Sequence, residues 1–183
     1  QQIPKKCGHL NGKKLISESD MVKKIQMIKK AAPTLKIVAR SDAYAVEGMP
    51  GMTERLHAYA EAGADIVFPE AMSSEADFRF VREEFDIPVL ANMTEFGKTE
   101  YIDLETFSEI GINLVLFPVT SLRAAAYNVE ETYKVIKEKG TQKSVLDKLQ
   151  TRKELYNILR LHEYEEMDSK IARTVLPDEQ TEE

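Results

Sequence analysis

The only cysteine of this chain lies in a polar setting that suits chemistry. Lys5, Lys6, Cys7, Gly8 and His9 follow one another, so the thiol stands between potentially cationic side chains and a glycine. A neighbouring lysine or protonated histidine favours the thiolate, which makes a cysteine a better nucleophile or proton carrier. A lone cysteine is more often a small buried apolar residue, but the residues around Cys7 are polar. The segment 5–9 therefore predicts a reactive thiol.

Polar side chains also follow four short apolar runs, at residues 35–39, 65–68, 87–91 and 113–117. Each run is separated from the next by a stretch with helical spacing, which is typical of repeated βα units with parallel strands. In such folds the functional site lies beyond the carboxyl ends of the strands. The polar residues that directly follow the runs are Arg40, Ser41, Asp42, Glu70, Asn92, Thr94, Glu95, Thr120, Ser121 and Arg123.

The types of these residues indicate a small polyacid as ligand. Guanidinium groups offer planar, bidentate donors to carboxylates, and amides and hydroxyls complete the bonding of carboxylate oxygens. For Glu70 three roles remain open: holding a hydrated cation such as Mg²⁺, orienting a substrate hydroxyl, or forming a buried ion pair with Arg40. The chain has no dedicated carboxylate cluster, so a complete metal site does not follow from the sequence.

The elements that must position these groups have recognisable signals. Apolar spacing predicts a helix between Ser17 and Pro33, another after Ser74, and a third over residues 122–136 that Gly140 can end. Residues 61–69 and 109–118 form a faint repeat that reads as helix end, glycine turn and strand. Such a repeat indicates that one module recurs around a sheet or barrel.

Composition limits the class of protein. The 183 residues are 43% hydrophobic and 31% charged, which suits one core in one domain. A single cysteine allows no disulfide within the chain, and no apolar run approaches the ~20 residues that cross a bilayer, so we expect a cytoplasmic location. The net charge of −6 argues against nucleic acid or an anionic membrane as partner. His57 and His162 are interpreted as structural.

Several blocks in order resemble the isocitrate lyase/phosphoenolpyruvate mutase superfamily, and within it the methylisocitrate lyase group. The blocks are Lys5–His9, Ala39–Ala43, Val46–Gly48, Phe68–Ala71, Ala91–Gly97 and Phe117–Arg123, and the carboxyl-terminal segments at 140–144, 150–152 and 164–166 favour that group. Ser41 departs from the family, which more often has threonine there.

The resemblance implies a (β/α)₈ barrel of the TIM type, of which this chain covers roughly the second half. Residues 1–140 would form that half, with the catalytic loop at 5–9. Residues 141–173 would be carboxyl-terminal helices, swapped between neighbours or at an oligomer interface, and residues 174–183 an acidic tail. The first half, with the aspartates that coordinate the metal, is expected outside this chain.

The resemblance further implies a carbon–carbon lyase that cleaves 2-methylisocitrate to pyruvate and succinate in the methylcitrate cycle of propionate catabolism. Mg²⁺, with Mn²⁺ as the alternative, would be the cofactor, and Glu70 would reach it through water. Cys7 would donate a proton, His9 would orient the thiol, and the active form would be a homotetramer that binds a small tricarboxylate. The implied substrate-binding residues are Cys7, Gly8, Arg40, Glu70, Asn92, Met93, Thr94, Arg123 and Arg152.

Two alternatives stay open at this point. One is isocitrate lyase, which would yield succinate and glyoxylate. The other is not enzymatic: a catalytically inactive half-barrel that acts only as a structural or binding unit. A half-barrel exposes sheet edges and apolar strand faces, so we expect such a unit to associate or aggregate.

Overall fold

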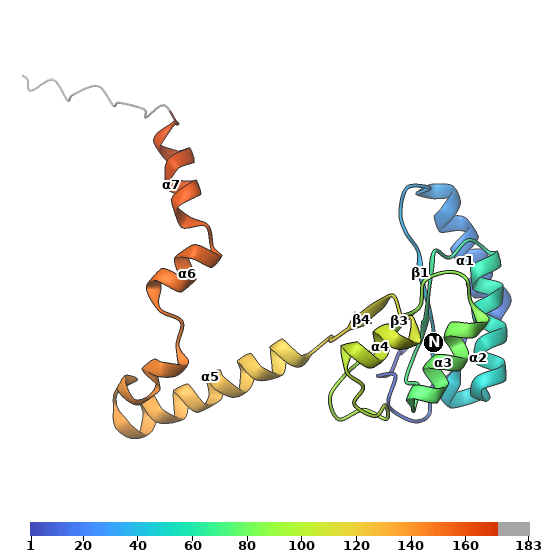
Figure 1. The fold of residues 1–183 in the computed structure, drawn as a ribbon, viewed down its shortest axis with the longest axis horizontal. Helices are drawn as coiled ribbons and strands as arrows, with labels where there is room; N and C mark the ends of the chain where they lie inside the picture. The colour runs from blue at the N-terminus through green and yellow to red at the C-terminus, as the bar shows by residue number, and fades with distance from the viewer. Residues whose placement is uncertain (172–183) are drawn as a thin grey trace, which may run out of the picture. The chain divides into compact units, whose positions relative to one another are not determined.

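A computed structural model describes residues 1–171 of the chain (Figure 1). The chain divides into two compact units, Gln1–Ala124 and Ala125–Glu183, of which the second is described as far as residue 171. Among the described residues no helix is long and apolar enough to cross a membrane. The predicted acidic tail at 174–183, together with residues 172 and 173 of the predicted carboxyl-terminal segment, lies outside the described residues.

The first unit contains four parallel strands: β1 (Val38–Ser41), β2 (Ile66–Pro69), β3 (Leu90–Asn92) and β4 (Leu114–Leu116). β1 pairs with β2 and β3 pairs with β4, while a parallel bridge between Val67 and Val89 connects the two pairs. The strands therefore follow one another in sequence order.

Each predicted apolar run overlaps a strand, but the strand begins one to three residues after the run does. The runs start earlier than the strands because residues that precede the regular pairing of β1 and β3, such as Ile37 and Val89, are already buried and therefore apolar.

Four helices belong wholly to the first unit: α1 (Glu18–Ala31), α2 (Tyr44–Glu61), α3 (Glu75–Glu84) and α4 (Leu104–Ile110). The predicted starts after Ser17 and Ser74 are confirmed, because each serine side chain accepts a hydrogen bond from a backbone N–H of the first turn. Ser74 and Asp77 form a reciprocal capping box. α2 is interrupted at Gly48, whose φ of +72° lies in the left-handed region that favours glycine.

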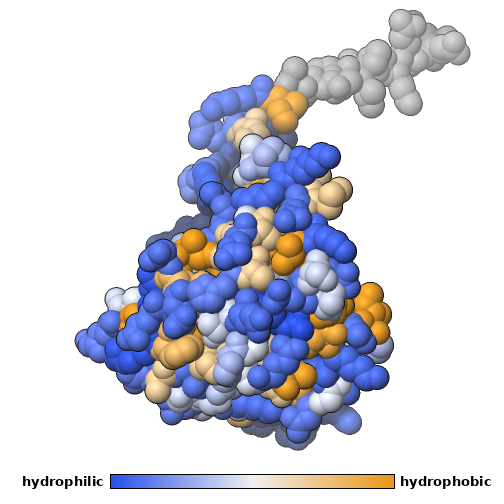
Figure 2. All heavy atoms as spheres, turned by 90° about the vertical axis from the view of Figure 1, so that its right-hand side faces the viewer, coloured by the Kyte–Doolittle hydropathy of each residue, from blue (hydrophilic) through white to orange (hydrophobic). Residues whose placement is uncertain are grey.

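The core of the first unit lies between the strands and these helices. α2 packs on β1 and β2, and α1 packs on α2. Phe78 of α3 and Phe107 of α4 meet edge to face, with ring centroids 5.2 Å apart and both side chains almost fully buried. Figure 2 views the side of the molecule on which α1, α2 and α3 lie in Figure 1, and this side is mainly hydrophilic with scattered apolar residues.

Several strand residues remain accessible within the described chain. In β1 the buried Ala39 and Ser41 alternate with the exposed Val38 and Arg40, and in β4 the side chains of Leu114 and Leu116 are exposed. Apolar side chains of β1 and β4 are thus exposed in the described part of the chain.

The helical segment after β4 consists of α5 (Thr120–Lys139), a 3₁₀ helix (Lys143–Lys148), α6 (Arg152–Ile158) and α7 (Leu161–Ser169). The predicted helix that ends at Gly140 is confirmed as α5, whose start lies in the first unit. Within residues 125–171 only Val145 is buried. The predicted role of residues 141–173 in swapping or oligomer contact stays a prediction.

The aromatic pair yields a test of the core. We expect Phe78→Ala to lower the free energy of unfolding by about 3–5 kcal/mol, because it removes the ring that fills the space between α3 and α4. The control is Phe80→Ala on the same helix, whose side chain is 42% exposed and should change stability by no more than about 0.5 kcal/mol. Urea denaturation followed by circular dichroism measures both values. Equal losses in the two variants would contradict the assignment of Phe78 to the core.

Candidate active site

The loop at residues 5–9 is tied to the end of β1 by the side chain of Gln1. The backbone N–H of Lys6 donates to Gln1 Oε1 at 2.9 Å, and Gln1 Nε2 donates to the Lys6 carbonyl at 3.0 Å and to Asp42 Oδ1 at 2.8 Å. A turn closes where Leu10 N–H donates to the Cys7 carbonyl at 3.0 Å. Cys7 itself is exposed, which the role of a reactive thiol requires.

A buried carboxylate joins this loop to three strands. Glu70 follows β2 directly and is 2% exposed. Its Oε1 lies 3.3 Å from Arg40 Nη2 and 3.7 Å from His9 Nε2, while its Oε2 accepts a hydrogen bond of 3.2 Å from Asn92 Nδ2. The ion pair between Glu70 and Arg40, one of the roles left open by the sequence, is confirmed. Residues far apart in the chain thus meet at one carboxylate.

The backbone of the loop also packs against this carboxylate. A Cβ atom added to Gly8 would lie 1.9 Å from Glu70 Oε1, well inside van der Waals contact. Only glycine fits at this position while Glu70 keeps its place.

Arg40 binds a second carboxylate in addition to Glu70. Its Nε and Nη2 atoms donate to the two oxygens of Asp42 at 3.0 and 2.9 Å, a bidentate arrangement. Burial alone would raise the pKa of Asp42, but the hydrogen bonds and the charge of Arg40, together with Gln1 and Lys13, outweigh burial and hold that pKa below its usual value. These contacts use Nε and Nη2 of Arg40, so Nη1 is the edge of the guanidinium through which Arg40 can meet a ligand carboxylate.

His9 is fixed in one orientation by the loop after β3. The backbone N–H of Lys98 donates to His9 Nδ1 at 2.9 Å, so Nδ1 is an acceptor and the proton of the neutral ring lies on Nε2. Burial lowers the pKa of His9, although Glu70 opposes the shift. A Cβ atom on Gly97 would lie 2.7 Å from the ring. His9 Nε2, buried and without a hydrogen-bond partner in the described residues, is a donor that faces Glu70.

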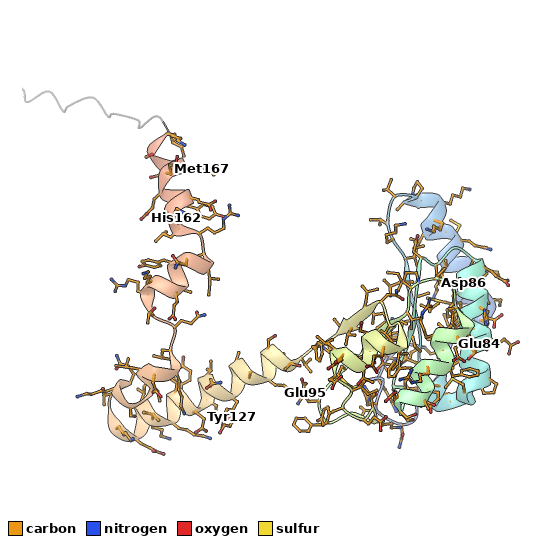
Figure 3. All side chains as sticks on the ribbon, in the orientation of Figure 1. Glu84, Asp86, Glu95, Tyr127, His162 and Met167 are labelled. Atoms are coloured by element: carbon orange, nitrogen blue, oxygen red, sulfur yellow. The ribbon has the colours of Figure 1, made fainter. Side chains whose placement is uncertain are left out.

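Arg123 belongs to a separate polar group in the first unit. Its Nε lies 3.3 Å from Glu95 Oε2, its guanidinium carbon lies 5.3 Å from the centre of the Phe96 ring, and the Thr120 hydroxyl donates to Glu95 Oε1. That hydrogen bond from Thr120 lowers the pKa of Glu95. Glu95, labelled in Figure 3, lies on the loop after β3. A substrate carboxylate would therefore compete with Glu95 for Arg123.

The remaining predicted residues differ in their surroundings. The Met93 side chain is buried, and its sulfur accepts a hydrogen bond from the Ile102 N–H at 3.3 Å. Thr94 is partly buried just after β3. Arg152 begins α6 and lies in the second unit, so its proposed contact with substrate stays a prediction.

Two lysines contribute to the site that the sequence interpretation did not select. Lys13 is 7% exposed and donates through Nζ to the carbonyl of Gly8. Lys98 supplies the N–H that binds His9, and its own ammonium group donates to Asn11 Oδ1 at 2.8 Å. A lysine is rarely buried unless it is paired, and nothing in the order of residues marks Lys13 as an exception. Lys98, in contrast, is exposed.

The described residues do not form a metal site by themselves. No group of three or more His, Cys, Asp or Glu residues within 1–171 could hold an ion. Both oxygens of Glu70 are already engaged, by Arg40 and by Asn92. Residues 1–171 therefore do not by themselves supply the ligands of a metal ion.

A cavity of about 860 Å³ lies beside the loop but is not the predicted site. It is lined by residues of the amino-terminal segment, α1, β1 and α2, and of the polar residues predicted at the strand ends Arg40, Ser41 and Asp42 reach it. The wall around it includes Val38 and Ile28, whose side chains are exposed. Of the predicted polar groups, Arg40, His9 and Asn92 gather instead around Glu70.

Known proteins resemble this chain in sequence. The sequence profile described as phosphoenolpyruvate phosphomutase matches residues 5–137. A 2-methylisocitrate lyase from Bacillus subtilis (strain 168) is 53% identical over 179 residues, covering 98% of this chain and 60% of that protein. The chain thus spans about 60% of the length of this curated relative.

Solved structures share the fold. A 2,3-dimethylmalate lyase of the PEP mutase/isocitrate lyase superfamily matches with a TM-score of 0.81 and 30% identity, over 91% of this chain and 56% of that one. An oxaloacetate acetylhydrolase in complex with 3,3-difluorooxalacetate matches with a TM-score of 0.82 and 26% identity, over 90% of this chain and 57% of that one. The predicted α/β fold class, covering about half of a TIM-type barrel, is confirmed.

The state of His9 can be measured directly. We expect ¹H–¹⁵N spectra to show the Nε2–H tautomer and a titration midpoint below the ordinary pH of 6.5, because burial disfavours the charged ring. Since the folded-state pKa is lowered, the contribution of His9 to stability is present above pH 6.5 and is lost as the pH falls below it. A His9→Gln variant assigns the signal. A midpoint at or above 6.5, or an Nδ1–H tautomer, would contradict this geometry.

Proposed function

Because the chain belongs to the phosphoenolpyruvate phosphomutase family, we propose that it is part of a lyase that cleaves 2-methylisocitrate to pyruvate and succinate. The observation that carries the proposal is the packing of the 5–9 loop on Glu70, which brings the only cysteine of the chain to the polar ends of the strands. The similarity to 2-methylisocitrate lyases supports the choice of reaction.

The charges of the site suit a substrate with several carboxylates. Lys13, Lys98 and Arg40 are cationic, while Asp42 and Glu70 are the carboxylates among them. An excess of positive charge in a partly buried site attracts a polyanion.

Individual residues can be assigned to parts of the substrate. Arg40 would bind one carboxylate through Nη1, and Arg123 a second one in exchange for Glu95. Asn92 Oδ1 is buried and has no hydrogen-bond partner in the described residues, so it can accept from a substrate hydroxyl. Thr94 and Met93 would contact the substrate just after β3, and Arg152 would bind a substrate carboxylate.

The reaction needs one proton to leave the substrate and one to return. A base takes the proton of the substrate hydroxyl, the oxygen becomes the carbonyl of pyruvate, and the carbon–carbon bond breaks. The electron pair of that bond stays on the carbon that becomes succinate, and the Cys7 thiol transfers its proton to this carbanion. His9, neutral with its proton on Nε2, donates toward the site and orients the loop that carries Cys7.

The metal and the assembly complete the proposal. Mg²⁺, or Mn²⁺, would stabilise negative charge on the pyruvate part when it is bound. Its direct ligands are proposed to come from outside residues 1–171, because Glu70 is engaged and reaches an ion only through water. We also propose that the protein works as a homotetramer, with the helices after residue 140 at the contacts between subunits.

The proton donor provides the first test. In the full-length protein, Cys7→Ser should lower kcat for 2-methylisocitrate by at least about 10²-fold, because a serine hydroxyl is a far weaker acid than a thiol. Substrate affinity, measured by isothermal titration, should change by less than about threefold, as expected when an interaction made only in the transition state is lost. Thermal unfolding at the wild-type temperature serves as the control for folding. A kcat near the wild-type value would rule out Cys7 as proton donor.

The products separate the proposal from its alternatives. Incubation with 2-methylisocitrate should yield pyruvate and succinate in equal amounts, and incubation with isocitrate should yield little glyoxylate. Preferential formation of glyoxylate would favour isocitrate lyase. Turnover of neither substrate in the presence of Mg²⁺, together with association that increases with concentration, would favour the inactive half-barrel.

A further inference from the structure

Lys13 is a buried cation in the site, and the proposed reaction gives it no role. It lies at the end of the segment that follows the 5–9 loop, and its side chain is almost completely withdrawn from water. Withdrawing an ammonium group from water is unfavourable unless charged or polar partners compensate it. A lysine retained in such a place therefore indicates that its head group performs a definite task.

The task is visible in what the ammonium group binds. Lys13 Nζ donates to the backbone carbonyl of Gly8, the residue between Cys7 and His9. A hydrogen bond from a charged donor is stronger than one between neutral groups. On its other side Gly8 packs so tightly on the Glu70 carboxylate that no Cβ would fit. The peptide of Gly8 is thus held between a buried cation and a buried anion.

The surrounding charges explain why the cation remains in place. Burial lowers the pKa of Lys13, and the carboxylates of Asp42 and Glu70 oppose the shift, while Lys98 and Arg40 add to it. The same two carboxylates hold Arg40. Lys13 therefore belongs to one network with Arg40, Asp42 and Glu70.

The hydrogen bond to Gly8 has consequences on both sides of the loop. Gly8 is adjacent to Cys7, which carries the thiol, and to His9. The ring of His9 accepts a hydrogen bond from the Lys98 N–H and packs against Gly97. If the carbonyl of Gly8 were released, the peptide could rotate and move both neighbours. A shift of about 1 Å in a catalytic group can lower the rate about 10²-fold.

We propose that Lys13 is a positioning residue: by binding the Gly8 carbonyl it fixes the backbone of the 5–9 loop, and so holds Cys7 toward the substrate and His9 on the Lys98 N–H. It acts through the loop and does not touch the reacting atoms. The part of this role that concerns turnover rests on the proposed lyase function, whereas the part that concerns loop order does not.

The test uses the full-length protein and the pair Lys13→Met and Lys14→Met. Methionine has a chain of similar length without the donor or the charge. Lys14 is the adjacent residue and is exposed, and its backbone carbonyl accepts a hydrogen bond from Gln2 N–H. Within residues 1–171 its side chain has no hydrogen bond or ion pair. The two variants therefore lose the same charge, but only Lys13→Met loses the contact with Gly8.

The first readout is amide hydrogen exchange, which needs no activity. Lys13→Met should accelerate exchange of the Lys98 amide and of residues 7–10 by about tenfold or more, as expected for the loss of a charge-assisted hydrogen bond. Residues 75–84 of α3 should exchange as in the wild type. Lys13→Arg, which keeps a cationic donor, should restore part of the protection at the Lys98 amide.

The second readout is kinetic. Lys13→Met should lower kcat by about 10²-fold and change KM by less than about threefold, as expected when positioning rather than substrate binding is lost. Lys14→Met should leave both values within about twofold of the wild type.

Two outcomes would overturn the proposal. One is the same exchange at Lys98 and the same kcat in Lys13→Met as in Lys14→Met. The other is equal acceleration of exchange in residues 75–84, since Lys13 would then only stabilise the fold. A wild-type protein without lyase activity would refute the proposed function, and the exchange experiment would still decide the role of Lys13.

Discussion

The site depends on one buried negative charge. The Glu70 carboxylate is almost completely removed from water, and an ionised carboxylate tolerates this only if charged and polar partners surround it. Arg40 from β1, Asn92 from β3 and the loop that carries His9 provide these partners. Contact with Glu70 therefore brings residues of two strands and one loop together in a single site.

The parallel strands make this convergence possible. Their carboxyl ends lie at the same edge of the sheet, so residues at or just after the ends of β1, β2 and β3 are neighbours in space, although 22 positions separate Glu70 from Asn92 along the chain. Behind this edge, residues of α2, α3 and α4 share one buried core with residues of the strands, and Phe78 and Phe107 are in contact within it.

The chemistry proposed for the site depends on differences in solvent exposure among its residues. Cys7 is exposed and can meet a substrate, whereas His9, Glu70 and Lys13 are shielded and act on the loop or on each other. The neutral His9 and the anionic Asp42 follow from their surroundings, the first from burial and the second from the guanidinium of Arg40. A family resemblance can name these residues, but their protonation states come from the contacts.

The sequence by itself determined the helices and strands, the helix starts at Ser17 and Ser74, and the polar residues at the strand ends, because these follow from local spacing and residue type. It also offered an ion pair between Arg40 and Glu70 as one possible role of Glu70. Only the tertiary structure decided which partner each polar group takes: Asp42 on Arg40, Glu95 on Arg123, the Lys98 N–H on His9, and Lys13 on Gly8. The physical reason is that such partners are selected by distance in the folded chain. The backbone N–H of Lys98 lies 89 positions from His9, and no local pattern encodes that contact.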